Sequence, residues 1–223
     1  GLRAARRSTI DGPAGALAPL PGRVYFTQDR AVAMNYARLP GRFDWGGTRF
    51  PEDAPGVLFQ IEIPRETPDL LIDEDDLGEA LTIALRVTGA VADAPAPDGA
   101  VLELGNQRLC DRVVCEPNLA AALVAAAACL STQERQALAC QDDTAPRGDL
   151  IAGAGKTLLA HGLSDALAGR LIDAGANVSL PAPVRVERAF RVPRDGRPVF
   201  APSLDLLLPW PAEARTDACG LRL

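Results

Sequence analysis

Two tyrosines are the residues of this sequence best suited to binding a ligand. Tyr25 and Tyr36 are the only tyrosines among the 223 residues, and they stand eleven positions apart. A phenol ring offers a large flat face for stacking and a hydroxyl at its tip for a hydrogen bond. Two such rings on neighbouring elements would enclose a flat aromatic ligand. We therefore treat both as candidate ligand-binding residues.

The elements expected around these tyrosines are a short strand and a helix. The apolar run at residues 24–26 predicts a buried strand. Thr27 and Asp29 are of the residue types that cap helices, and the apolar residues after them predict a helix that ends before Pro40. A core strand with a packing helix, and no ligand, would give the same pattern.

The stretch at residues 24–37 resembles the nicotinamide-binding strand and helix of the ADP-ribosyltransferase superfamily, especially its poly(ADP-ribose) polymerase branch. In that branch a Tyr-Phe-Ala strand end leads, at the same spacing, to Ser-Ala-Asn-Tyr, and both tyrosines flank the nicotinamide ring of NAD. The resemblance implies that Tyr25 and Tyr36 bind this ring. Ala33 stands where that branch has a serine that hydrogen-bonds the carboxamide, and alanine cannot make that bond.

ADP-ribosyl transfer, which the resemblance implies, also needs a group that stabilises positive charge on the ribose. A carboxylate near the ribose hydroxyls can do this by electrostatics and general-base help. Glu187 is the candidate catalytic residue, because it lies in a late segment whose apolar and charged residues alternate as in a half-buried strand. The alternative is a surface glutamate paired with Arg185 or Arg188. Asp173 is a weaker candidate for the same role.

Composition and charge limit the classes of partner. The net charge of −6 argues against nucleic-acid binding by a basic surface, and against the RNA 2'-phosphotransferase branch of the same superfamily, which uses basic residues around the phosphate. Five cysteines without a C-x-x-C pair and a single histidine, His161, predict no metal site. No segment is apolar over the width of a bilayer, so we expect no membrane partner. We expect a cytoplasmic protein, or an effector delivered into the cytoplasm of a target cell.

Three local motifs predict structure rather than chemistry. The acidic run at residues 73–76 predicts a solvated turn before a helix at residues 79–87, since the alternating ligands of a calcium loop are absent. The capping box Ser-Thr-Gln-Glu at residues 131–134 predicts the start of a helix. Gly-Ala-Gly-Lys-Thr at residues 153–157 lacks the first glycine of a phosphate loop, and it predicts instead the entry to a helix at residues 156–168.

The sequence opens with Gly1-Leu2-Arg3. In the superfamily that the tyrosine motif resembles, Gly-Leu-Arg closes the first helix, after a strand with a Tyr-His-Gly-Thr type motif. The resemblance implies that this sequence begins one strand and one helix late. A missing N-terminal segment or a partner chain would then supply the histidine or arginine that orients the NAD ribose.

These inferences together predict an α+β fold: an ADP-ribosyltransferase-like split twisted sheet with flanking helices and a helical insertion near residues 100–150. The domain would span residues 1–192, followed by a proline-broken tail at residues 193–223. The expected function is NAD-dependent ADP-ribosyl transfer to a protein or nucleic-acid acceptor, as in a bacterial toxin or effector. The alternatives are a catalytically inactive interaction or regulatory domain of this fold, and an RNA 2'-phosphotransferase-like enzyme.

Overall fold

A computed structural model of the chain describes residues 20–30, 32–34, 56–92, 94, 106–140 and 147–192. The described residues form a mixed α+β structure, as the sequence predicts, and its sheets are small and antiparallel. They divide into two compact units, the first with residues 20–70 and 180–192, the second with residues 71–179. Predictions that concern Gly1-Leu2-Arg3, Tyr36 and the tail at residues 193–223 lie outside the described residues.

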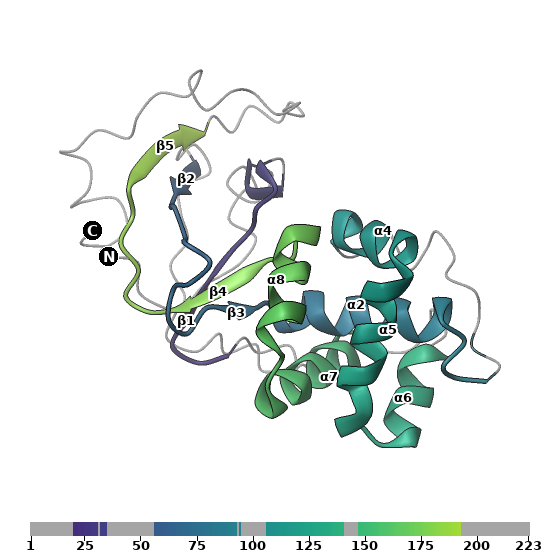
Figure 1. Ribbon diagram of the computed structural model, residues 1–223. Coiled ribbons are helices and arrows are strands. Elements are labelled where there is room, and N and C mark those ends of the chain that lie inside the picture. The colour runs from purple at the N-terminus through teal and green to yellow at the C-terminus, as the bar shows by residue number, and fades with distance from the viewer. Residues whose placement is uncertain are drawn as a thin grey trace. The chain divides into compact units, whose positions relative to one another are not determined.

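The second unit is built around one buried helix, α2 (Glu74–Val87). From Leu77 to Arg86, every residue of α2 except Glu79 is buried. A helix that is buried on all sides needs neighbours on all sides. Four helices contact α2 (Figure 1), namely α4 (Gln107–Cys115), α5 (Pro117–Ala126), α6 (Thr132–Ala139) and α7 (Arg147–His161). The short η2 (Ala127–Cys129) follows α5, and α8 (Asp165–Ala174) packs on α4 and α5.

Two glycines bring α2 and α7 unusually close together. A Cβ added to Gly78 would lie 2.0 Å from the carbonyl oxygen of Ile151, and one added to Gly155 would lie 1.8 Å from that of Glu74. Any larger residue at either place would collide with the backbone of the facing helix. The two glycines of the Gly-Ala-Gly-Lys-Thr motif therefore lie inside α7, and one of them, Gly155, allows α7 to pack on α2. Both predicted bounds of the helix at residues 156–168 are wrong. Helix α7 begins at Arg147 and already ends at His161, and the next helix, α8, begins at Asp165.

Side chains cap the N-termini of several helices. Ser131 and Glu134 make both bonds of the predicted capping box: the Ser131 N–H donates to Glu134 Oε2 at 2.7 Å, and the Glu134 N–H donates to Ser131 Oγ at 3.2 Å. The capping box is thus confirmed. Helix α4, which is not among the helices predicted from the sequence, begins after Asn106, whose Oδ1 accepts from the Leu109 N–H at 3.2 Å.

The acidic residues 73–76 do not form the solvated turn that the sequence predicts. Asp73 is the N-cap of α2, and its Oδ1 accepts from the Asp75 N–H at 2.9 Å. The helix therefore begins at Glu74, earlier than predicted. Glu74 and Asp76 are only 3% and 5% exposed. Carboxylates are favoured in a first turn because the helix dipole is positive there.

The helices of the second unit lie in the sequence between two paired strands. β3 (Leu71–Ile72) is antiparallel to the start of β4 (Val178–Pro181), with Leu71 opposite Ser179 and Ile72 opposite Val178. The Asp73 N–H adds a bond to the Asn177 carbonyl at 2.9 Å. The chain thus enters and leaves the helical segment through adjacent strands.

The first unit contains β1 (Arg23–Phe26), β2 (Gly56–Gln60) and β5 (Arg188–Val192). β2 and β5 are antiparallel, with Leu58 opposite Phe190. β1 lies beside β4 in the strand order, and next to it the Ala182 N–H donates to the Gly22 carbonyl at 2.8 Å. Of the candidate residues, Tyr25 lies in β1 and Glu187 directly precedes β5.

Within the described part of the chain, no single helix is both long and apolar enough to cross a bilayer. Only α4 together with α5 and η2 reaches the necessary length and composition, and these are bent by 103° at their junction. Both helices of that pair contribute buried residues to the second unit, Leu109 and Leu123 among them.

Candidate functional site

Tyr25 lies in the middle of β1 and is half-buried. Its hydroxyl oxygen accepts a hydrogen bond from the Leu20 N–H at 2.8 Å. This bond holds the polar tip of the ring against the chain that enters β1. The predicted strand at residues 24–26 is present, since β1 covers it, but its residues are half-buried rather than buried. The second tyrosine of the motif, Tyr36, lies outside the described residues.

A capped helical turn follows β1, as the sequence predicts. The Thr27 Oγ1 accepts from the Asp29 N–H at 3.0 Å, and the Asp29 Oδ1 accepts from the Val32 N–H at 3.2 Å. The Ala33 N–H donates to the Asp29 carbonyl at 3.0 Å, which is a helical bond. Asp29 therefore caps the turn and fixes the direction in which the next residues leave β1.

Met34 joins this turn to the two-stranded sheet. It is 1% exposed and forms a small core with Leu58 of β2 and with Phe190 and Val192 of β5. Ala33 is partly buried and packs against this core. The Ala33 methyl therefore has a packing role, and the side chain offers no hydrogen bond to a carboxamide.

Glu187 lies immediately before β5, and its carboxylate is exposed. Its Oε1 accepts from the Glu62 N–H at 3.3 Å, and its own N–H donates to the Gln60 carbonyl at 3.3 Å. Gln60 is the last residue of β2 and Glu62 follows it, so the side chain of Glu187 is anchored at the end of the sheet. The predicted strand is shorter than expected, because regular pairing starts only at Arg188, opposite Gln60.

The alternative pairing of Glu187 with neighbouring arginines is not formed. Among the described residues, neither Arg185 nor Arg188 makes an ion pair with it, and all three side chains are exposed. The anchoring bond from Glu62 was not predictable, since the two residues are 125 positions apart and no sequence motif links them.

Two other residues considered for chemistry lie in the second unit. Asp173 is exposed on α8, and His161 is the exposed last residue of α7.

A buried polar cluster, which was not predicted from the sequence, joins α2 to two distant segments. Asp76 Oδ2 accepts from Asn106 Nδ2 at 2.7 Å and from the Asn177 N–H at 2.6 Å, and Asp76 Oδ1 accepts from Asn177 Nδ2 at 3.3 Å. Glu79 Oε2 accepts from the Asn106 N–H at 3.1 Å. The one local sequence signal for this cluster is Asn106, since asparagine commonly caps the start of a helix.

Burial changes the pKa values of the carboxyl groups in this cluster and of Asp73, the N-cap of α2. It raises the pKa of Asp73 and of Glu79 to about 7, with the charge of Asp76 adding to the rise in both. Burial also raises the pKa of Asp76, against the effect of its hydrogen bonds from Asn177 and Asn106. The pKa of the buried Cys110 thiol rises to about 12, first through burial and then through Glu79 and Asp76. Cys110 therefore remains a thiol at neutral pH and is not a nucleophile.

The cluster also has no metal-binding arrangement. Across the described ranges, no three His, Cys, Asp or Glu side chains are grouped so that they could hold a metal ion. The amide groups of Asn106 and Asn177 instead satisfy the carboxylate of Asp76 directly. We interpret the cluster as a structural junction.

The raised pKa values predict that the chain loses stability as the pH rises from about 4 to about 7. In the unfolded chain Asp73 and Glu79 release their protons near their ordinary pKa values, whereas the folded chain holds them until about pH 7. Between these limits the folded state binds more protons, so the free energy of unfolding falls with rising pH and then levels off. Urea unfolding followed by far-ultraviolet circular dichroism measures this.

The matched control for the pH effect is the double variant Asp73→Asn/Glu79→Gln. It keeps an acceptor oxygen at both places, so the bonds from the Asp75 and Asn106 N–H groups can still form. We expect its urea midpoint to change less over the same pH range. A wild-type midpoint that rises through this range, or an equal fall in the variant, would contradict the assignment.

The candidate site of the first unit thus consists of a half-buried tyrosine, an alanine that packs in the core and an exposed, anchored glutamate. They are Tyr25, Ala33 and Glu187. No protein-family model, no curated protein and no solved structure matches this chain.

Proposed function

We propose that the first unit has an ADP-ribosyltransferase-like fold, binds NAD and transfers its ADP-ribosyl group to a protein or nucleic-acid acceptor. NAD is a substrate in this reaction. Tyr25 and Tyr36 would stack on the nicotinamide ring, and Glu187 would act at the ribose next to it.

One observation carries the proposal. Met34, in the helical turn that follows Tyr25, packs on Leu58 and Phe190, so the tyrosine motif and the β2–β5 sheet share one core. Glu187 is anchored at the end of that same sheet by the Glu62 N–H. The tyrosine and glutamate that the resemblance pairs, Tyr25 and Glu187, are far apart in the sequence yet belong to one compact unit.

Each proposed site residue has a defined role in the reaction. The bond between the ribose C1' and the nicotinamide nitrogen breaks, nicotinamide leaves as a neutral molecule, and an acceptor nucleophile forms the new bond to C1'. Glu187 is exposed, so its carboxylate can face the positive charge that develops on the ribose and can accept the proton of the nucleophile. Stacking by the tyrosines orients the ring that leaves.

Ala33 limits how the amide of nicotinamide can be recognised. Its methyl group packs on the Met34 core and cannot donate or accept a hydrogen bond. The carboxamide would have to be bound by main-chain groups, as backbone N–H and C=O groups serve ligands in many pockets. This departure is also the observation that favours the second candidate, an interaction or regulatory domain that keeps the fold without the activity.

The test uses the purified chain, NAD labelled in its adenylate portion, and cell lysate as the source of acceptors. We expect label to enter macromolecules with the wild type and to fall about a hundredfold with Glu187→Gln, because the amide lacks the negative charge. Calorimetry should show NAD affinity lowered roughly ten- to hundredfold by Tyr36→Ala, through loss of stacking. Glu187→Gln should bind NAD nearly as well as the wild type.

Tyr25→Phe is the control for the tyrosine variants. It keeps a ring for stacking and removes only the hydroxyl that accepts from the Leu20 N–H. NAD affinity should therefore remain close to that of the wild type. Absence of NAD binding by the wild type would rule out the transferase and leave the non-catalytic domain, whereas binding without transfer would separate recognition from catalysis.

A further inference from the structure

Two arginines, Arg185 and Arg188, lie beside Glu187 in the sequence. Arg185 and Arg188 are both exposed, and within the described part of the chain neither makes a hydrogen bond or an ion pair through its side chain. Three other arginines of the first unit are engaged: Arg23 donates to the Asp69 carbonyl, and Arg30 and Arg65 also have partners. The positive charge available to a ligand among these residues is thus concentrated on either side of Glu187.

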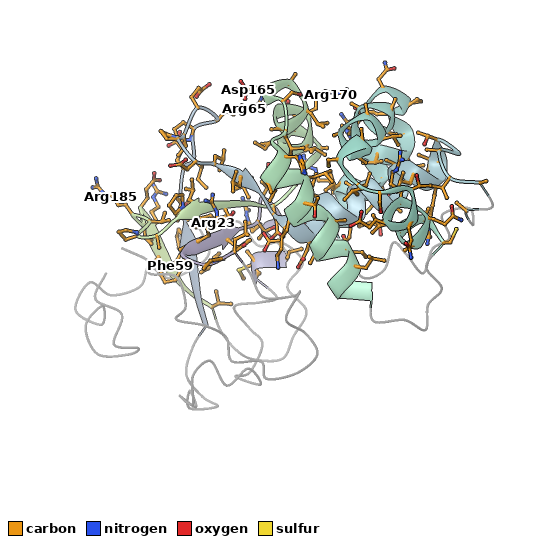
Figure 2. The ribbon with its side chains drawn as sticks, turned by 90° about the horizontal axis from the view of Figure 1, so that it is seen from below. Arg23, Phe59, Arg65, Asp165, Arg170 and Arg185 are labelled. Atoms are coloured by element: carbon orange, nitrogen blue, oxygen red, sulfur yellow. The ribbon has the colours of Figure 1, made fainter. Side chains whose placement is uncertain are left out.

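The side chains of Arg185, Glu187 and Arg188 all lie on the surface of the first unit. Val184 is buried and Val186 half-buried, whereas Arg185 and Glu187 between and after them are exposed. Arg185 and Glu187 are thus both on the surface of this segment, in which the chain bends at Glu187 before β5. Figure 2 shows Arg185 at the outer margin of the first unit. Arg188 opens β5 opposite Gln60, and both of these side chains are exposed.

We propose that Arg185 and Arg188 bind the pyrophosphate of NAD, an inference that rests on the proposed function. In NAD the nicotinamide ribose is joined to the pyrophosphate through its own C5', so a carboxylate at the ribose lies one sugar away from two negative charges. The planar guanidinium group matches the geometry of phosphate oxygens and can bind them with two parallel hydrogen bonds. These cations would also offset the repulsion between Glu187 and the pyrophosphate.

Because neither arginine has a side-chain partner within the described part of the chain, both are suited to binding a ligand. An arginine that already forms an ion pair must give it up, or share it, before it binds a phosphate. Arg185 and Arg188 need no such exchange, so the free energy of each new charge-assisted bond contributes directly to affinity.

The test compares Arg185→Ala/Arg188→Ala with a control that loses the same charge elsewhere. Arg112→Ala/Arg170→Ala is matched, since both arginines are on the surface of the second unit and pair with Glu116. Calorimetry measures NAD and ADP-ribose, and ligand-observed NMR measures nicotinamide alone. We expect the first variant to lose roughly ten- to hundredfold in affinity for NAD and ADP-ribose, without change for nicotinamide. The control variant should match the wild type.

Salt provides a second readout. The affinity of the wild type for NAD should fall as salt increases, because exposed charges are screened, and this dependence should be weaker in Arg185→Ala/Arg188→Ala. A merely structural effect of the substitutions would not change the salt dependence. Circular dichroism of both variants checks that they are folded.

The outcomes separate the two proposals. If the wild type binds NAD and the Arg185→Ala/Arg188→Ala variant binds it equally well, the pyrophosphate assignment is wrong and the proposed function stands. An equal loss in the control variant would also overturn the assignment, because the effect would then be one of net charge. If the wild type binds neither NAD nor ADP-ribose, both proposals fail. An arginine-dependent affinity for a single-stranded oligonucleotide in that case would point to a nucleic-acid ligand.

Discussion

Replacing Gly155 with alanine destabilises the second unit by at least about 3 kcal/mol, at or above the upper end of the range for overpacked interiors. The new Cβ would lie 1.8 Å from the carbonyl oxygen of Glu74. A flexible side chain could rotate away from such a contact, but a backbone carbonyl within α2 cannot. The two helices must therefore move apart, and the packing between them is lost along with the close approach.

Urea unfolding followed by far-ultraviolet circular dichroism measures this effect, because the helices α2 to α8 of the described chain all lie in the second unit. Gly78→Ala should behave similarly, since its Cβ would lie 2.0 Å from the Ile151 carbonyl. Gly153→Ala is the control in the same helix, with no atom within 4 Å of its added Cβ. It should gain up to about 1 kcal/mol from the better helix propensity of alanine. Equal midpoints for Gly155→Ala and Gly153→Ala would contradict the close packing.

Replacing Asp76 with alanine is the second substitution with a large expected effect, a loss of about 3 kcal/mol or more. Asp76 accepts hydrogen bonds from Asn106 Nδ2 and from both the N–H and Nδ2 of Asn177. In the wild type Asp76 is only 5% exposed. Without its carboxylate, these donors would therefore remain in a buried site. Each buried donor that loses its partner costs about 1 to 3 kcal/mol.

Hydrogen exchange locates this effect as well as measuring it. The main-chain N–H of Asn177 donates directly to Asp76. Its hydrogen exchange should therefore become faster in Asp76→Ala by more than global destabilisation would cause. Asp76→Asn keeps one acceptor oxygen and should lose less. Asp75→Ala is the control from the same helical turn, since Asp75 is exposed, and its change should stay within about 1 kcal/mol. A loss in Asp75→Ala as large as in Asp76→Ala would show that only the helix dipole matters.

The parts of the fold that could be predicted are those whose partners are close in sequence. The caps at Thr27 and Asp29 and the capping box of Ser131 and Glu134 are bonds across two or three residues, and all are present. The strand with Tyr25 was predictable because a run of apolar residues directly before a helix start is typical of a short buried strand.

The parts that could not be predicted depend on contacts between distant residues. The acidic residues before α2 look like a solvated turn in sequence, and Asp76 can be buried only because Asn106 and Asn177, the latter 101 positions away, donate hydrogen bonds to it. The sequence predicts that a helix starts just after Gly155, but Gly155 lies inside α7, where the close approach of α7 to α2 outweighs its weak helix propensity. Of the candidate site, the tyrosine motif was visible in sequence, whereas the anchoring of Glu187 by Glu62 was not.

The pairing of β3 with β4 has a consequence for the order in which the chain folds. Only two residue pairs join these strands, and the whole of residues 73–177 lies between them. In an unfolded chain, closing so long a loop costs entropy that so short a ladder does not repay. The helices therefore have to form and pack first, which brings the two strands within reach of each other. Contacts of such large sequence separation are slow to form, so this ladder should be among the last parts of the second unit to become protected during refolding.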